Sequence, residues 1–263
     1  MKNFLYIFFT VSLFFIHITS KAQILNVEKS RLDVGDSSRW VGNINVNFEL
    51  INQQIETYGG GIKGNFAHVG QKHDFIVLAD LSLLNSEGFD LLQNGFIHIR
   101  SKFRKHKRLS FEAFTQAQYD QVKGMNERLL LGGNARWRFF RKEQTVLIFG
   151  VGTFYEIEDW RWEEVTDTET IITTASPKLF RSNLYLKYRL DYNETVYLNF
   201  IVYHQSSFTD AQNYRISGET NINFKISSSL TFNNKFTLWY DNQPYVPIDQ
   251  LNYTMKNGII YKF

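Results

Sequence analysis

One short stretch of this sequence, His204-Gln205-Ser206-Ser207, carries the residue types of a catalytic nucleophile and its base. A serine hydroxyl acts as a nucleophile when an imidazole within hydrogen-bond reach accepts its proton and a third group orients that imidazole. In an extended chain His204 and Ser206 lie on the same face as Phe200 and Val202, so both would be presented at an apolar surface. The sequence offers no convincing orienting group. We therefore expect a chain that is not an enzyme, with lipid hydrolysis by His204 and Ser206 as the alternative.

A second set of candidates is basic and recurs at every second position of three segments: Arg100, Lys102, Arg136, Arg138, Lys187 and Arg189. Basic side chains that line a pore select anions or small polar solutes. The same side chains can instead form cross-strand ion pairs with carboxylates and stabilise a closed interior. Because both signs of charge occur on the polar face of these segments, the pattern favours the structural network.

Metal and cofactor chemistry has little support in the sequence. There are 6 His and 0 Cys, and the histidines show no paired metal spacing. The lack of cysteine excludes disulfides, thiolate zinc sites and iron–sulfur clusters. The segment 158–178 is acidic, and carboxylates suit Ca²⁺ or Mg²⁺, so it could bridge to lipopolysaccharide or dock a partner. A solvated loop is the favoured interpretation, and we expect no metal and no cofactor.

The elements that would position these residues alternate between apolar and polar side chains with a period of two. In the segment 40–50, for example, Ile44, Val46 and Phe48 alternate with Asn45 and Asn47. A strand uses this period and a helix cannot. About twelve such runs occur, near 40–51, 55–68, 72–84, 93–104, 107–120, 127–141, 144–157, 179–191, 194–207, 212–226, 229–241 and 251–263. Most are long for a soluble sandwich but suit tilted strands that cross a bilayer.

The connections between the runs alternate between tight turns and longer loops. Residues 69–71, 192–193 and 227–228 are short links, whereas 158–178 and 242–250 are long ones. An even number of strands with short turns on one side and long loops on the other is typical of outer-membrane barrels. We therefore predict an all-β fold, a transmembrane antiparallel up-and-down β-barrel of about twelve strands with both termini in the periplasm. A soluble sandwich or lipocalin-like barrel would instead place the apolar faces inward.

The start of the chain predicts export to the Gram-negative envelope. Residues 1–22 have a charged start, an apolar stretch and a small-x-small cleavage site, as in a secretory signal peptide. Residues 23–39 are then a periplasmic N-terminal segment, and 40–263 are the barrel. The net charge of +3 among 263 residues is too small and dispersed to indicate nucleic acid as a partner.

The end of the chain and the aromatic residues support the same fold. Ile259, Tyr261 and Phe263 share one face of the last run, and a terminal aromatic there resembles the assembly signal of outer-membrane barrels. Other aromatics, among them Trp137 and Phe154, fall near the ends of the runs, where two girdles meet lipid headgroups. The expected partners are therefore outer-membrane lipid, lipopolysaccharide and the barrel-assembly machinery, the last through the C-terminal strand.

The last third of the chain resembles a known family. The elements that carry the resemblance are Tyr203-His204-Gln205, the stretch from Asp210 through Tyr214-Arg215 to Pro244, and the ending Gly258-Ile259-Ile260-Tyr261-Lys262-Phe263. The chain is similar here to the YdiY-like family, domain of unknown function 481, of salt-induced outer-membrane proteins. The resemblance is best over 180–263. It implies an outer-membrane β-barrel and supplies no activity and no catalytic residues.

The His204 element also resembles a His-x-Ser element of outer-membrane phospholipase A, a twelve-stranded barrel. Here Ser207 and Phe208 stand where that enzyme family has Asn-Gly, which places the likeness in doubt. The sequence therefore predicts a barrel with a role in envelope integrity or as a narrow solute channel. A lipid hydrolase and a barrel that docks a partner through the loop 158–178 are the alternatives. The oligomeric state is not indicated.

Overall fold

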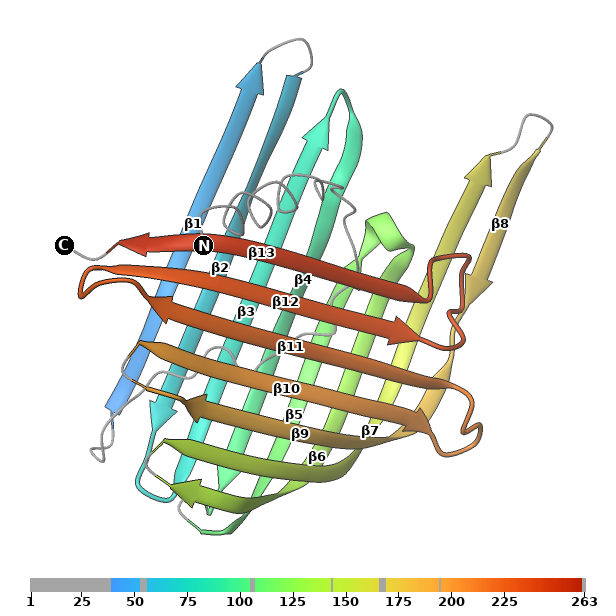
Figure 1. Ribbon diagram of the computed structural model, residues 1–263. Coiled ribbons are helices and arrows are strands. Elements are labelled where there is room, and N and C mark those ends of the chain that lie inside the picture. Colours follow the sequence, from blue (N-terminus) through green and yellow to red (C-terminus); the bar gives the residue numbers. More distant parts are fainter. Residues whose placement is uncertain are drawn as a thin grey trace, which may run out of the picture.

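The computed structural model describes residues 39–52, 56–104, 107–142, 144–165, 169–193 and 195–261. Twelve strands follow one another in a single antiparallel sheet, each hydrogen-bonded to its neighbours in the chain (Figure 1). They are β1 (Arg39–Asn52), β2 (Glu56–Val69), β3 (His73–Ser86), β4 (Phe89–Phe103), β5 (Leu109–Asp120), β6 (Met125–Lys142), β7 (Thr145–Val165), β9 (Lys178–Asp191), β10 (Val196–Ser207), β11 (Tyr214–Lys225), β12 (Leu230–Asp241) and β13 (Leu251–Tyr261). The predicted up-and-down β fold is confirmed, and each expected run overlaps one of these strands.

The sheet curls, so that β9 to β13 cross in front of β1 to β6 (Figure 1). The strand order begins at β1 and ends at β13, and no pairing between these two strands occurs among the described residues. Because the number of strands on this path is even and all pairs are antiparallel, β1 begins and β13 ends at the same rim. The sheet is thus the wall of a barrel with one seam, between β1 and β13.

The alternation in the sequence sorts side chains to the two faces of this wall. On β5, Ser110, Glu112 and Gln116 are buried inside, while Leu109 and Phe111 are exposed outside. The outer face of β1 likewise exposes large apolar side chains, with Phe48 at 78% exposure. Apolar residues therefore face outward and polar ones inward, the reverse of a soluble sandwich.

A thirteenth strand corrects the expected long loop at 158–178. β7 runs to Val165, and β8 (Thr170–Ala175) pairs with its far part, from Trp160↔Ala175 to Val165↔Thr170. The two form a hairpin that projects beyond the rest of the wall (Figure 1). Backbone pairing between β-branched residues of β8 and the end of β7 explains why this segment is a ribbon and not an irregular loop.

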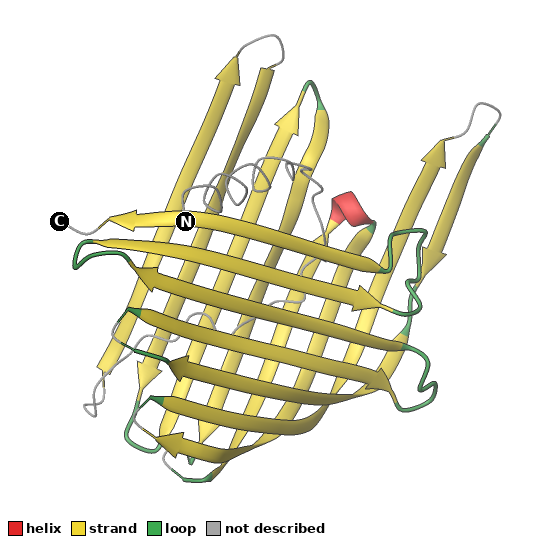
Figure 2. Cartoon of the chain, in the orientation of Figure 1, coloured by secondary structure: helices red, strands yellow, loops and turns green. Residues whose placement is uncertain are grey.

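Helical structure is limited to one turn in the described part of the chain, η2 (Gln121–Lys123), which links β5 to β6 (Figure 2). Gly124 ends this turn with a φ of 75°, a left-handed conformation that suits glycine. Over the same residues, no helix is long and apolar enough to cross a membrane.

Some expectations concern residues outside the described ranges, or side chains that are not described. The signal peptide 1–22 and nearly all of the segment 23–39 lie outside them, as does Phe263. Of the expected assembly signal, Tyr261 is the last residue of β13, and Ile259 is exposed on its outer face. One aromatic expectation is wrong: Phe154 is buried in the interior, because it falls on the inward register of β7 between Gly152 and Glu156.

Candidate functional site

The interior of the wall holds far more polar than apolar side chains. Among the described residues, 24 polar or charged residues are buried against 11 hydrophobic ones. Burying a charge is costly unless it is paired and hydrogen-bonded. The lumen is therefore the place to look for function, and the pairing of its charges determines what space remains.

Three arginines and three carboxylates form one buried ionic cluster, called here the outer cluster: Arg128, Arg181, Arg215, Glu156, Glu158 and Asp241. Arg215 Nη1 lies 2.7 Å from Glu158 Oε1, and Arg215 Nε lies 2.8 Å from Asp241 Oδ2. Arg128 Nη2 lies 2.5 Å from Glu156 Oε1, and Arg181 Nε also donates to Glu156. Three positive and three negative groups thus balance one another.

The outer cluster crosses the lumen. Arg215 comes from β11 and its partners Glu156 and Glu158 come from β7, and β9 and β10 lie between these two strands in the sheet. Because two strands separate β11 from β7, the Arg215 side chain must cross the lumen to contact Glu156 and Glu158. The ion pairs therefore hold two sides of the barrel together and fill the space between them.

The link between β12 and β13, residues 242–250, covers the outer cluster. Tyr245 lies over the Arg215 guanidinium at 5.9 Å and accepts a hydrogen bond from Asn213 Nδ2 at 3.0 Å. Val246 packs with Met125 and Trp160 in a small hydrophobic cluster. Burial raises the pKa of the Tyr245 phenol above its usual range. The long link thus acts as a cap on this end of the lumen.

A second buried group, called here the inner cluster, surrounds Glu112. Glu112 Oε1 lies 3.2 Å from Arg136 Nη1, 3.9 Å from Arg100 Nη1 and 4.0 Å from Lys102 Nζ. Arg136 Nε donates to the Tyr185 hydroxyl at 2.7 Å, and that hydroxyl lies 3.4 Å from Glu112 Oε2. Three of the six predicted basic residues are therefore brought together around one carboxylate.

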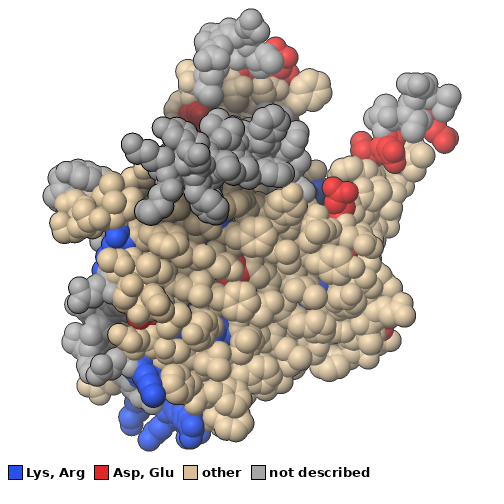
Figure 3. All heavy atoms as spheres, in the orientation of Figure 1, with Lys and Arg blue, Asp and Glu red and all other residues tan. Residues whose placement is uncertain are grey.

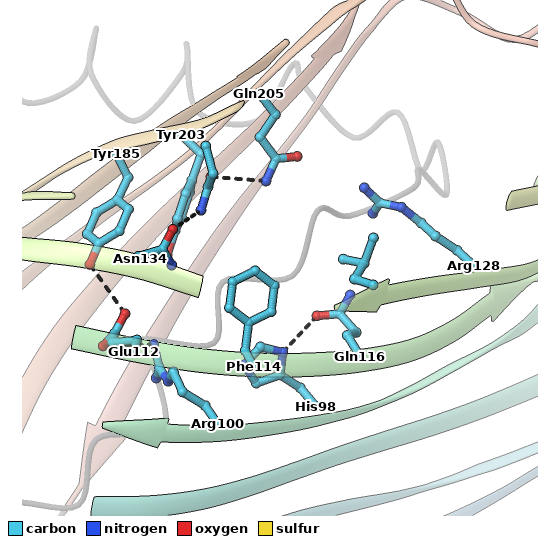
Figure 4. A pocket seen from close by; sticks show the side chains of 12 residues that line it. His98, Arg100, Glu112, Phe114, Gln116, Arg128, Asn134, Tyr185, Tyr203 and Gln205 are labelled. Atoms are coloured by element: carbon cyan, nitrogen blue, oxygen red, sulfur yellow. Dashed lines mark hydrogen bonds and ion pairs between the residues drawn. The ribbon is translucent and has the colours of Figure 1, made fainter. Parts of the chain in front are cut away.

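Between the two clusters lies a small polar hollow (Figure 4). Asn183 Nδ2 donates to Asn134 Oδ1 at 2.9 Å, and Gln205 Nε2 donates to Asn183 Oδ1 at 3.3 Å. On the other side His98 Nδ1 and Gln116 Oε1 lie 2.9 Å apart. These side chains bond to one another and line the hollow together with Phe114, Leu130 and Tyr203.

Two glycines of β7 make this arrangement possible. Asn134 belongs to β6 and Asn183 to β9, and β7 runs between them with Gly152 beside both. A Cβ at Gly152 would overlap Asn134, and one at Gly150 would overlap the Tyr185 ring. Side chains from two strands that are not neighbours can thus touch across a strip of β7 that has no side chains.

The other three predicted basic residues lie apart from the inner cluster. Arg138 and Lys187 are half-buried, and Arg189 is exposed, with its Nη2 3.1 Å from Asp191 Oδ2. The geometry of Arg100, Lys102 and Arg136 supports a structural network. A basic constriction that selects anions stays a prediction.

The candidate catalytic pair lies on the outer face. His204 is exposed and its ring stacks on Tyr214 with 5.7 Å between centroids. Ser206 Oγ donates to the carbonyl of Ala211 at 3.3 Å and lies 3.4 Å from that of Ser207. The hydroxyl is thus engaged with backbone and the imidazole with an aromatic ring, an arrangement that does not form a nucleophile–base pair. Among the described residues, no group of three or more His, Asp or Glu is placed to hold a metal ion.

Sequence reasoning missed most of the outer cluster. Glu156 and Glu158 were expected to belong with an acidic outer loop, but they face inward on β7 and are about 1% exposed. Arg128 and Arg181 carried no signal of their own. The period of two already places Glu156 on the inner face of the run 144–157, and continuing it past residue 157 places Glu158 there too, where buried charge requires partners.

Replacing Arg215 with methionine leaves Glu158 and Asp241 buried without their common partner. We expect Arg215→Met to lower the free energy of unfolding by about 3–5 kcal/mol, measured by urea unfolding in lipid vesicles. The control is Arg161→Met, which removes a pair with Glu163 whose side chains are 53% and 50% exposed. An exposed pair contributes about 0–1 kcal/mol, so equal losses in the two variants would contradict the role given to the outer cluster.

A methyl group at Gly150 has no room beside the Tyr185 ring. Gly150→Ala should therefore lower the free energy of unfolding by about 1–3 kcal/mol, the usual range for overpacking. Gly258→Ala is the matched control, since nothing lies within 4 Å of the Cβ that it adds. Urea unfolding of both variants in vesicles tests this. Equal stability of Gly150→Ala and Gly258→Ala would show that Tyr185 of β9 does not pack over Gly150.

Comparison with known proteins identifies the family of the chain. Among curated proteins none matches the chain. A solved structure described as a NanC porin in a rhombohedral crystal form is similar, with 10% sequence identity and a TM-score of 0.46, over 85% of this chain and 99% of that one. The family described as "Protein of unknown function, DUF481" matches residues 52–263. The chain therefore belongs to the DUF481 family, as the resemblance in its last third predicted.

Proposed function

We propose that this protein is an outer-membrane β-barrel that gives small polar solutes a narrow aqueous path. The observation that carries the proposal is the reversed sorting of side chains, with apolar residues exposed outside and charges buried inside. In lipid every backbone polar group must be paired, so the barrel closes by pairing β1 with β13. The rim at which β1 begins and β13 ends then faces the periplasm, with the longer links on the cell surface.

The distribution of surface charge supports this placement. In Figure 3, basic residues gather at one end of the visible face and acidic residues on the projecting hairpin, with few charges between them. Leu131 on β6 and Leu184 on β9 are exposed in this intermediate region of their strands. A belt of uncharged and apolar side chains between charged rims is what a bilayer requires of a barrel. Lipid, lipopolysaccharide and the assembly machinery that inserts the last strand are the partners this implies.

The space for a path lies beside the ionic clusters. The inner faces of β1 and β2 carry exposed polar side chains, among them Asn45, Asn47 and Lys63. No reaction is assigned to the chain, because Ser206 donates to backbone carbonyls and His204 stacks on Tyr214. A closed barrel whose lumen is filled on the side of the ionic clusters and unfilled beside β1 and β2 is best suited to slow passage of small solutes.

Substitution of Leu131 by a charged residue tests whether this side chain faces lipid. Leu131→Arg should lower the free energy of unfolding in vesicles by about 2–4 kcal/mol, because an arginine on the lipid face of a barrel is poorly solvated. Ile172→Arg is the control, since Ile172 is exposed on β8 in the hairpin beyond the wall. Surface changes in water cost within about 0.5 kcal/mol, so a similarly small effect at Leu131 would argue against a membrane barrel.

Conduction is the direct test of the proposed path. Purified folded protein, recognised by heat-modifiable migration, should give small single-channel currents in planar bilayers, because part of the inner wall is polar and exposed. The control is the same preparation after heat unfolding. If the folded protein gives no current and does not speed sugar entry into vesicles, the proposal of a solute path fails.

A further inference from the structure

The inner wall has a second polar region that differs in chemistry from the two ionic clusters. On β1 the inward positions carry Asn43, Asn45 and Asn47, all exposed. On β2 Asn65 donates from Nδ2 to Asn43 Oδ1 at 2.8 Å. Asn45 and Asn47 have no side-chain hydrogen-bond partner among the described residues, and all four amides are exposed or half-buried.

A matching set of amides lies near the other end of the strand order. Asn233 on β12 donates from Nδ2 to Asn221 Oδ1 at 2.6 Å and to Asn223 Oδ1 at 2.7 Å, both on β11. Closing the barrel through β1 and β13 gives the neighbour order β11, β12, β13, β1, β2. Amides then line four of five adjacent strands; Asn221 and Asn233 are half-buried and Asn223 is buried. We call this surface the amide wall.

The charges on and beside the amide wall nearly cancel. Lys63 Nζ lies 2.9 Å from Asp80 Oδ2, and Lys235 Nζ lies 2.8 Å from Glu219 Oε2. Glu49 on β1 and Lys256 on β13 are single charges of opposite sign, both exposed and both on the inward register. With the exposed Lys225 at the end of β11, four positive and three negative groups leave a net charge of only +1, which gives little preference for an anion or a cation.

The opposite half of the lumen is closed by its own contacts. Asn134, Arg136 and Arg128, all on β6, are each less than 10% exposed. A solute could pass there only by breaking buried ion pairs, whose partners would be left in a poorly hydrated space. Along the amide wall a solute exchanges hydrogen bonds with water and amides, which costs little.

We propose that the solute path runs along the amide wall and that it takes small uncharged polyhydroxy solutes. A side-chain amide has two N–H donors and a carbonyl acceptor. A row of amides can therefore donate to a hydroxyl group or accept from it, and it attracts neither an anion nor a cation by charge. This proposal rests on the proposed function, since it names where the path lies and what it takes. In this proposal the amides of the wall, and not the basic residues of the inner cluster, determine which solutes pass.

The absence of native cysteine makes a thiol-labelling test specific. Asn45→Cys and Asn221→Cys place a thiol on the amide wall, and Asn134→Cys places one in the packed half. Each folded variant is measured in planar bilayers before and after a trimethylammonium methanethiosulfonate reagent. We expect both wall variants to be modified quickly, by mass, and to lose most of their current, while Asn134→Cys keeps its current.

Solute class is tested in vesicles that swell when sugar enters. The wild-type protein should admit arabinose faster than gluconate or glucosamine of similar size, and the reagent should stop arabinose entry in the wall variants only. Loss of current through Asn134→Cys alone, or faster entry of gluconate than arabinose, overturns this inference but leaves a channel. A wild-type protein with no current and no sugar entry overturns the proposed function itself. Asn47→Cys and Asn233→Cys serve as second wall variants where either first variant does not fold.

Discussion

A sheet that shows apolar side chains on its outer face must satisfy the other half of its side chains inside. Here that half includes arginines and glutamates, and a charge without a partner in such a space would cost several kcal/mol. Arg215 contacts Glu158, Glu156 and Asp241 from one guanidinium. Because Arg215 and Glu158 belong to strands on different sides of the lumen, this pairing also determines how the two sides approach.

The side chains that cross the lumen need space on the inner face of the wall, and the glycines of β7 provide it. Gly150 and Gly152 leave a strip without side chains on its inner face, over which Tyr185 reaches Arg136 and Asn183 reaches Asn134. The side of the lumen near β7 is consequently filled by cross-strand contacts. The glycines and the ion pairs form one arrangement, since neither the ring nor the amide would reach its partner past a larger residue.

The sequence predicted much of the wall and little of its interior. Period-two alternation predicts the twelve strands because the alternation of apolar and polar residues within each strand shows which of its faces is apolar. The sequence does not predict the hairpin of β7 and β8, because the acidic residues of 158–178 fit a solvated loop equally well. Arg128 and Arg181 were missed for another reason: their partner Glu156 lies 28 and 25 residues away along the chain. Such pairing depends on register and curl across several strands, and a local pattern does not contain it.

Hydration explains why the buried ion pairs and the exposed amides occupy different parts of the lumen. A buried ion pair is stable only when both groups are tightly held, so arginines and carboxylates gather where β7, β9 and β11 curl towards one another. An asparagine loses little when water takes the place of one partner, so amides can line a wet surface such as the inner face of β1. The amides beside β7 are satisfied in another way: Asn134 and Asn183 are buried and form a direct hydrogen bond with each other. The division of the interior thus follows from how close the strands come to one another.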